Sequence, residues 1–351
     1  MLKQDNSVWT AGLNSYGQLG IGSRKSSGGS FTRAINSGAR LLAAGGGHSL
    51  MLKQDGSVWA VGRNNYGQLG DQSTSDKSSF VQVIFEPAKA VSAGRFHSLV
   101  LLQDTSVWAT GSNAYGQLGD ESTTNRLSFM PVGLSGASCV VAGRDYSIVL
   151  KHDGSVWTTG RNQHGQLGVG STTSKSTFER VAFSDAKAAS AGSYHSMVLK
   201  SDGSVWTTGR NTYGQLGDGS QTSKNTFAQV VSGGVQAVAA GSDHSMVLKI
   251  DGSVWSTGRN MHGQLGDGST VDRTSFVQVI SAGALSIAAG GVHSMALTRE
   301  SGYVVLATGG NMWGQLGDGS TTSKNSFGIV ASAGGGTWCC GACITSRTLG
   351  C

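Results

Sequence analysis

Histidine is the residue type whose repetition in this chain points most directly to chemistry. Five copies precede a serine at equivalent positions about 50 or 100 residues apart: His48, His97, His195, His244 and His293. Imidazole nitrogens bind transition metals at about 2 Å, so a ring of histidines would suggest a metal site. Equivalent loops of packed sheets lie about 10 Å or more apart, however, and one ion cannot bridge them. We expect each imidazole to make a hydrogen bond that fixes its own loop.

A glycine-rich motif, N-x-x-G-Q-L-G, is the second pattern with a chemical interpretation. Such loops bind phosphate when a strand precedes them and a helix follows. The GQLG core occurs seven times at intervals of 49 to 51 residues, beginning at Gly17, Gly67, Gly116, Gly165, Gly214, Gly263 and Gly314. A phosphate loop occurs once per nucleotide site, so this repeated motif is architectural. We expect its Asn and Gln to satisfy backbone groups and its Leu to be buried.

The carboxylates and cysteines do not form a recognisable reactive site. An aspartate follows GQLG in five copies, at Asp71, Asp120, Asp218, Asp267 and Asp318. Acid–base catalysis needs two carboxylates in different environments, which equivalent turn residues do not provide. Cys340 and Cys343 have C-x-x-C spacing, but no second pair completes a tetrahedral zinc site. We predict no catalytic residue, metal or cofactor, and the cysteine usage favours a reducing, intracellular compartment.

Arginines are better placed to bind another molecule. Two sets of cations recur: an arginine before the repeated Asn (Arg63, Arg161, Arg210, Arg259), and a cation in every later loop from Lys77 to Lys324. In an up-and-down sheet both positions lie at one end, so that end collects two rings of basic residues and attracts an acidic partner. The turn aspartates neutralise part of this charge, and an ordinary solvated surface is the alternative interpretation.

Larger side chains join these arginines in the loops before the histidines. Arg95, Phe96, Arg144 and Tyr194 occupy positions that differ from copy to copy, which leaves them free for function. Arginine and aromatic residues are favoured anchors of protein interfaces. The sequence therefore predicts a binding face that contains Arg63, Arg161, Arg210, Arg259, Arg95, Phe96, Arg144 and Tyr194.

Short strands must position these residues. In residues 235–280, "VQAVAAG" and "HSMVLK" precede the Asp251-Gly252 turn, which "SVWSTG", the GQLG loop and "FVQVI" follow. Asp-Gly between apolar runs is a strong hairpin signal. The six "SVW" tryptophans (Trp9, Trp59, Trp108, Trp157, Trp206, Trp255) are expected to pack between units. Four strands in each of seven units predict an all-β, seven-bladed β-propeller.

Both ends of the chain are needed to close this ring. Aligning Phe327 with Phe276 places Gly341 on Gly290 and Ile344 on a histidine position. Residues 336–351 would supply the first strand and part of the second of the closing blade, and residues 1–35 the third and fourth. Residues 1–3 compete with residues 347–349 for the second strand. Closure leaves no free strand edge, and we predict one domain over residues 1–351.

The overall composition agrees with a soluble, turn-rich β protein. The chain has 351 residues, of which 38% are hydrophobic and 13% charged, with 55 Gly and 2 Pro. No run approaches 18 apolar residues and the opening "MLKQDNSVW" lacks a signal-peptide core, so we expect no membrane span. The net charge of +6 permits an acidic protein partner, but without interleaved exposed aromatic residues it leaves nucleic-acid binding undecided.

The order G-x-x-H-S, D-G, V-W and T-G-x-N-x-x-G-Q-L-G, as in residues 241–266, resembles the regulator-of-chromosome-condensation repeat family over essentially the whole chain. The resemblance implies a seven-bladed propeller. Its relatives include a small-GTPase exchange factor, an ultraviolet-B receptor and scaffolds beside ubiquitin ligases. The even repeat length leaves no room for the exchange factor's wedge, and the positions of the receptor's loop tryptophans hold other residues.

These observations predict a non-catalytic scaffold or adaptor that binds another protein or complex through one loop face. One alternative is a chromatin- or small-GTPase-associated regulator like the founding family member. A propeller enzyme is the other alternative. The chain lacks the long loop insertions that wall in an active-site pocket, which argues against the enzyme.

Overall fold

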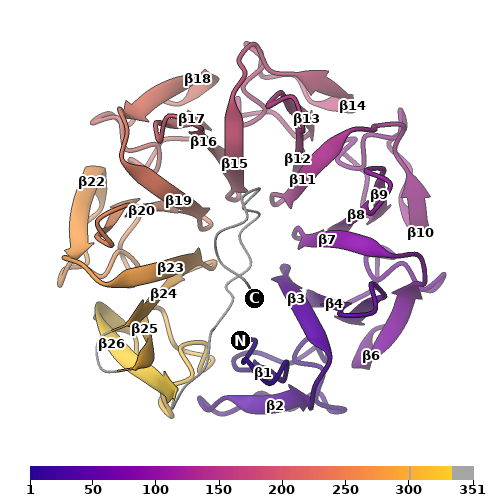
Figure 1. Ribbon diagram of the computed structural model, residues 1–351, viewed down its shortest axis with the longest axis horizontal. Helices are drawn as coiled ribbons and strands as arrows, with labels where there is room; N and C mark the ends of the chain where they lie inside the picture. The colour runs from indigo at the N-terminus through magenta and orange to yellow at the C-terminus, as the bar shows by residue number, and fades with distance from the viewer. Residues whose placement is uncertain (300–301, 334–351) are drawn as a thin grey trace.

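The computed structural model describes residues 1–299 and 302–333, and every regular element there is a β-strand. The strands form seven sheets arranged in a ring around a central axis (Figure 1). Six sheets are four-stranded, antiparallel blades, and the seventh contains two strands. In each complete blade the first strand lies nearest the axis and the fourth at the rim (Figure 1). The predicted all-β propeller is confirmed.

We number the four-stranded blades in chain order. Blade 1 contains β3 (Ala39–Ala44), β4 (His48–Lys53), β5 (Val58–Gly62) and β6 (Lys77–Ile84). Blade 2 contains β7 (Ala88–Ala93), β8 (His97–Leu102), β9 (Val107–Gly111) and β10 (Arg126–Pro131). Blade 3 contains β11 (Ala137–Ala142), β12 (Tyr146–Lys151), β13 (Val156–Gly160) and β14 (Lys175–Arg180).

The second half of the ring repeats this pattern. Blade 4 contains β15 (Ala186–Ala191), β16 (His195–Lys200), β17 (Val205–Gly209) and β18 (Lys224–Val231). Blade 5 contains β19 (Val235–Ala240), β20 (His244–Lys249), β21 (Val254–Gly258) and β22 (Arg273–Ile280). Blade 6 contains β23 (Ala284–Ala289), β24 (His293–Arg299), β25 (Tyr303–Gly309) and β26 (Lys324–Ala333). The two-stranded seventh sheet consists of β1 (Val8–Thr10) and β2 (Thr32–Ile35).

Each blade has two ends, which differ in their loops. The turn between the second and third strands is tight: in blade 5, Ser253 N donates to the Asp251 carboxylate at 2.8 Å and Gly252 has φ +79°. A positive φ of this size suits glycine, as the hairpin prediction required. The loops between strands one and two and between strands three and four emerge at the opposite end. We call that end of the ring the loop face.

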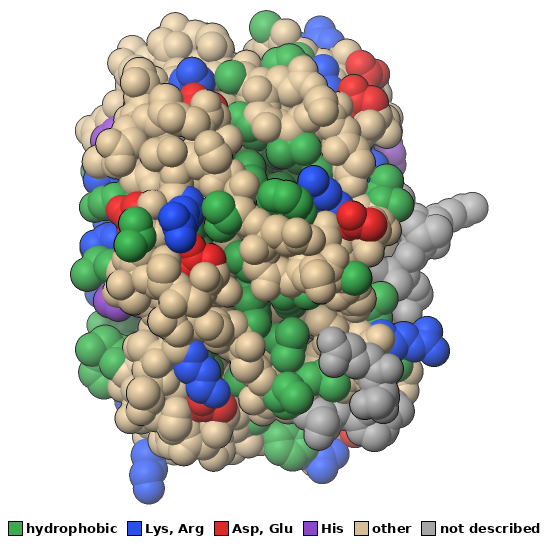
Figure 2. All heavy atoms as spheres, turned by 90° about the vertical axis from the view of Figure 1, so that its left-hand side faces the viewer, with side chains coloured by type: hydrophobic (Ala, Val, Ile, Leu, Met, Phe, Trp, Pro, Cys, Tyr) green, Lys and Arg blue, Asp and Glu red, His purple; other side chains and the backbone are tan. Residues whose placement is uncertain are grey.

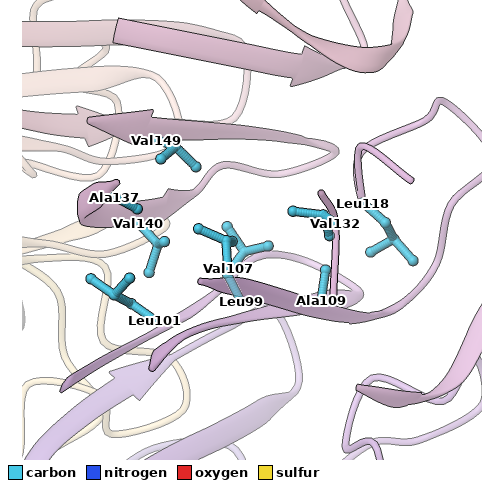
Figure 3. Packing of buried hydrophobic residues seen from close by; sticks show 9 residues of the cluster. All are labelled: Leu99, Leu101, Val107, Ala109, Leu118, Val132, Ala137, Val140 and Val149. Carbon is cyan, nitrogen blue, oxygen red and sulfur yellow. The ribbon is translucent and has the colours of Figure 1, made fainter. Parts of the chain in front are cut away.

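Neighbouring blades pack through apolar side chains. Leu99, Leu101 and Val107 of blade 2 are fully buried against Ala137, Val140 and Val149 of blade 3 (Figure 3). Burying a Val or Leu side chain contributes about 1.5–3 kcal/mol, so one such interface already stabilises the ring appreciably. Trp157 borders this cluster and is partly buried, which confirms the predicted position of this tryptophan between blades.

The GQLG loop is the second inter-blade contact. A Cβ on Gly119 of blade 2 would lie 2.4 Å from Cε2 of Phe178, so the ring of this blade 3 residue rests on bare backbone. Beside it, Thr159 Oγ1 of blade 3 donates to Gly116 O of blade 2 at 2.9 Å. The last glycine of the motif is therefore required by close packing of the next blade, in addition to its role in the turn.

The seventh sheet packs against both neighbouring blades through the same contact between a glycine and a phenylalanine, and Gly20 of this sheet lies against Phe80 of blade 1. Phe31 packs on Gly317 of blade 6, and Ser30 pairs with Asp318. Residues 1–3 also take part, because Leu2 pairs with Val8 and Trp9 N donates to Met1 O at 2.9 Å. These residues thus occupy second-strand positions, as the alignment allowed. Residues 336–351, predicted to complete this blade, lie outside the described residues, and this part of the closure stays a prediction.

A truncation tests the closure. If residues 336–351 complete the closing blade as the alignment predicts, deleting them removes apolar side chains from it and should lower Tm by about 5–10 °C. It should also promote concentration-dependent aggregation, since strand edges would be left unpaired. Thermal melting with light scattering measures both effects. The matched control is a chain ending at residue 346, which should melt like the full chain because residues 1–3 already hold the competing positions. Equal Tm values for all three chains would contradict the prediction.

Candidate functional site

The loop face is positioned by the N-x-x-G-Q-L-G motif, whose polar side chains hold their own backbone. In blade 1, Leu69 N donates to Asn64 Oδ1 and Tyr66 N donates to Gln68 Oε1, both at 2.9 Å. Asn64 Nδ2 donates in turn to the Asp71 carboxylate at 2.8 Å, and Leu69 is fully buried. The predicted architectural role of the motif is confirmed. The loop is a rigid base for the arginine that precedes it.

The histidines connect neighbouring blades. The Nε2 atom of His48 lies 2.9 Å from Oγ of Ser98 in blade 2, and this hydroxyl donates to Gln68 O at 2.7 Å. Because the hydroxyl has one hydrogen, it accepts from the imidazole, which must be protonated on Nε2. The same chain of hydrogen bonds starts from His97, His195 and His244. A hydrogen bond was predicted, but it joins two blades rather than fixing one loop.

Burial keeps these four imidazoles neutral. It lowers the pKa of His48 and His195 to about 4 and that of His97 and His244 to about 3. The pKa of the fifth histidine, His293 of blade 6, is likewise lowered by burial to about 4. Blade 3 has Tyr146 at this position, and its hydroxyl donates to the carbonyl of His195 and lies 3.1 Å from Ser196 Oγ. Among the described residues, no group of three or more His, Cys, Asp or Glu side chains could hold a metal ion.

The cations in the later loops, from Lys77 to Lys324, form the outer set on this face. Each of them is neutralised by a nearby carboxylate. Five of its members form an ion pair with the turn aspartate of their own loop, at 2.7 to 3.2 Å: Lys77–Asp71, Arg126–Asp120, Lys224–Asp218, Arg273–Asp267 and Lys324–Asp318. Lys175 pairs with Glu179, because Val169 replaces the aspartate in that copy. Figure 2 shows basic and acidic side chains side by side along the rim. This predicted outer ring is therefore not a source of net positive charge.

Hydrogen bonding explains why these aspartates stay ionised. Burial by itself would raise the pKa of Asp71, but hydrogen bonds from Ser73, Asn64 and Lys77 lower it below its ordinary value. The same causes, with Arg126 in place of the lysine, lower the pKa of Asp120. A carboxylate that accepts several hydrogen bonds is stabilised in its charged form. These groups are turn and ion-pair partners, in agreement with the sequence interpretation.

The arginines before the repeated Asn form the inner set, and they contact aromatic rings. The guanidinium carbon of Arg161 is 4.8 Å from the Tyr115 ring and 5.2 Å from the Tyr194 ring. Arg210 lies 5.8 Å from Tyr194 and 5.2 Å from Tyr213, and Arg259 lies 4.7 Å from Tyr213. The arginines thus alternate with aromatic rings of neighbouring blades. Cation–π contacts of this kind contribute about 0.5–1 kcal/mol each at partly exposed sites.

Two aspartates complete this half of the loop face. Asp145 pairs with Arg144 at 3.4 Å and with Arg161 at 3.3 Å. Asp243 pairs with Arg210 at 3.8 Å and with Arg259 at 3.5 Å. Four of the predicted site arginines therefore lie together in blades 3 to 5, three of them on Tyr194 and Arg259 on Tyr213, and each has a carboxylate neighbour.

The remaining predicted residues form a second group in blades 1 and 2. Arg63 lies 4.8 Å from the Tyr16 ring and 4.9 Å from the Phe96 ring, and Arg95 lies 4.6 Å from the same Phe96 ring. Tyr66 contacts Phe96 at a centroid distance of 5.1 Å. The structure thus brings the eight predicted residues onto one face, in two groups.

Sequence reasoning missed the aromatic partners of these arginines. They occupy the third position of the N-x-x-G-Q-L-G motif, which holds an aromatic or imidazole ring in every copy: Tyr16, Tyr66, Tyr115, His164, Tyr213, His262 and Trp313. This regularity was a usable signal. The view that the basic residues lack interleaved aromatic residues is wrong, because tyrosines of one blade contact arginines of the next.

The described residues line a cavity at the centre of the face. This cavity of about 400 Å³ lies at the axis and is lined by the loops between first and second strands, including Arg95 and Arg144. Most of its lining is glycine and alanine backbone, which offers few side chains for chemistry. Backbone hydrogen bonds cross between blades here, for example from Arg95 N to Arg144 O at 3.1 Å. In the part of the chain that the structure describes, no helix has the length and hydropathy of a membrane span.

Fold and repeat pattern together define the class of protein, a β-propeller built of repeats of about 50 residues. Sequence comparison identifies the regulator of chromosome condensation (RCC1) repeat at residues 40–68, 88–117, 137–166, 186–215 and 235–264. A second form of the same repeat matches residues 55–101, 153–199, 202–248 and 251–297. The matches cover more than half of the chain, which therefore belongs to the RCC1 repeat family.

Several solved structures have the same fold. Yeast RCC1 (Prp20), solved with Kap60 bound to it, is 20% identical with a TM-score of 0.82, over 93% of this chain and 84% of that chain. Human WBSCR16 is 22% identical with a TM-score of 0.82, over 93% and 94%. Prp20p from Saccharomyces cerevisiae, described with its binding to Gsp1p and histones, is 20% identical with a TM-score of 0.81, over 93% and 86%. At these identities the likeness shows the fold. A search of curated proteins finds no match.

The buried histidines predict a pH dependence. Their folded pKa values lie below the ordinary value of 6.5, so the unfolded chain binds protons first as the pH falls. The free energy of unfolding should therefore decrease from pH 6.5 toward pH 4, by up to about 1.4 kcal/mol per pH unit and histidine. Urea unfolding at several pH values measures the slope. A stability that stays constant between pH 7 and 5 would contradict it.

A matched variant isolates one histidine. His97→Tyr introduces the residue that blade 3 already uses at this position, so the link to the next blade is retained. The slope of stability against pH should fall by about a fifth, because one of the five imidazoles whose pKa burial lowers is removed.

Proposed function

We propose that this protein is a non-catalytic interaction module that binds another protein through its loop face. One observation carries the proposal: six arginines on this face contact aromatic rings, and among the described residues two aspartates form ion pairs with four of them. The face therefore retains net positive charge while the outer cations are cancelled. Arginine and tyrosine held in fixed positions lose little side-chain entropy on binding, which favours them as interface anchors.

The chemistry of the other polar groups supports a binding role over catalysis. The buried histidines are held neutral in links between blades, and the turn aspartates are held in ion pairs with their own loops. Neither set offers a nucleophile beside a base, or two carboxylates of different pKa. The even repeat length gives no insertion from which to build a walled pocket. These features weigh against the propeller-enzyme alternative.

The alternative function, a chromatin- or small-GTPase-associated regulator, is also a protein-binding function and differs only in naming the partner. Prp20 is reported with Kap60, Gsp1p and histones, all of which are proteins. These partners do not carry over to this chain, since at 20% identity the likeness shows the fold alone. The absence of an inserted wedge in the even repeats argues against nucleotide exchange by that route. We therefore propose protein binding, with an acidic surface as the expected partner chemistry.

A triple variant tests the proposal. Arg161→Ala, Arg210→Ala and Arg259→Ala together should abolish or strongly reduce capture of the partner from native extract, read by quantitative mass spectrometry. The expected loss is at least about tenfold, because removing interface anchors commonly costs more than 1 kcal/mol each.

The control changes an equal number of cations at the opposite end of the blades. Lys53, Lys151 and Lys249 each lie over a tryptophan ring, at 3.7 to 4.5 Å, and their replacement by Ala should leave capture unchanged. Loss of the partner in the control alone, or equal capture by all three proteins, would place the function elsewhere.

A further inference from the structure

The two halves of the loop face differ in charge compensation. In blades 3 and 5 the residue just before the second strand is Asp145 or Asp243, and each pairs with two arginines. The same position holds Gly47 in blade 1 and Phe96 in blade 2. Arg63 and Arg95 consequently make no ion pair with any described residue, although both lie on the same face as the paired arginines.

Phe96 holds both of these cations in place. Its ring lies 4.9 Å from the guanidinium carbon of Arg63 and 4.6 Å from that of Arg95. Tyr16 contacts Arg63 from the preceding sheet at 4.8 Å, and Tyr66 packs against Phe96. Arg63 is half-buried and Arg95 is exposed, so their polar edges remain accessible beside the aromatic surface. The two guanidinium groups are organised before any ligand binds.

Glycines make room for this arrangement. A Cβ on Gly47 would lie 3.4 Å from the Cβ of Arg63, and a Cβ on Gly46 would lie 3.0 Å from Cγ of Arg95. A side chain at Gly46 would crowd the stem of Arg95, whereas one at Gly47 would reach van der Waals contact with the stem of Arg63. The glycines of residues 45–47 therefore add neither an acidic side chain nor any other side chain beside Arg63 and Arg95.

We propose that Arg63, Arg95 and Phe96 form a recognition site for an acidic segment of a partner protein, a short run of Asp or Glu side chains. Guanidinium groups bind carboxylates through paired, charge-assisted hydrogen bonds, and a fixed guanidinium loses less entropy on doing so. Phe96, Tyr16 and Tyr66 offer apolar contact to the intervening side chains. This inference rests on the proposed function, because it places the protein-binding site within the loop face.

The distribution of charge favours a short acidic peptide over a nucleic acid. A polyphosphate backbone needs a continuous positive track, since its affinity comes from several phosphate contacts. Here the two unpaired arginines are followed around the ring by Asp145 and Asp243, and outward by the ion-paired turn aspartates such as Asp71 and Asp120. A peptide with a few adjacent carboxylates matches the size of the unneutralised patch.

Fluorescence anisotropy with defined probes tests the site. The probe is a fluorescein-labelled 12-residue peptide that alternates Glu with Gly, and its reference is the same peptide with Gln in place of Glu. The full chain should bind the Glu peptide more tightly than the Gln peptide, and the affinity should fall as salt is raised. The double variant Arg63→Ala and Arg95→Ala should weaken binding by about tenfold or more, because two charge-assisted contacts are lost.

The matched control is Arg126→Ala with Arg273→Ala, which removes the same charge from ion-paired positions. This control should change the affinity less than about threefold, since paired surface cations contribute little. Arg63→Lys with Arg95→Lys should give an intermediate affinity, because charge is kept but the planar contact to Phe96 is lost. Thermal melting checks that each variant is folded.

Three results would overturn the inference. They are no difference between the Glu and Gln peptides, an equal loss in the control variant, or tighter binding of a labelled 12-nucleotide single strand that depends on the same two arginines. The capture experiment with the Arg161, Arg210 and Arg259 variant separates the two proposals. If that variant loses its partner while the Glu peptide fails to bind, the loop face stands as the protein-binding surface and the acidic-segment site does not.

Discussion

The link between each blade and the next is the constraint on which the rest of the structure depends. In blades 1, 2, 4 and 5 a buried imidazole donates to a serine of the next blade, and in blade 3 Tyr146 takes the place of the imidazole. The serine donates back to the glutamine carbonyl of the first blade's GQLG loop. The last glycine of the same loop accepts the phenylalanine ring of the following blade. One motif thus closes its own loop and joins two sheets, which explains why its residues recur almost unchanged.

Because the motif residues hold the blades together, the residue types at other loop positions can differ from blade to blade. The position just before the second strand contributes no side chain to the sheet or to the link between blades, and it holds Gly47, Phe96, Asp145, Tyr194, Asp243 and Val292 in the six complete blades. Their identity sets the charge of the loop face blade by blade. Asp145 and Asp243 form ion pairs with the arginines of blades 3 to 5, whereas Phe96 contacts two arginines without neutralising them.

Most of the fold could be predicted because the repeats are local. The Asp-Gly hairpin, the buried second strand and the GQLG loop each follow from a few adjacent residues, and seven copies make the ring. The site was harder to predict from the sequence than the fold, because the contacts between arginines and aromatic rings join different blades. The contact of Arg161 with Tyr115 depends on how the loops of two blades are placed. The ion pair of Lys77 with Asp71 lies within one loop and depends on side-chain directions that sequence spacing does not give. The pairing of outer cations with turn aspartates was anticipated only as partial neutralisation, and the aromatic partners were missed.

The central claim is that this propeller docks its partner on the loop face while the Asp-Gly end stays free. Hydrogen–deuterium exchange on the complex with the captured partner tests it most directly, because both ends carry exposed backbone amides that report separately. We predict slower exchange in the loops around Phe96, Arg144 and Tyr194, with unchanged exchange at turns such as Asp251-Gly252. Protection confined to the Asp-Gly turns would contradict the account.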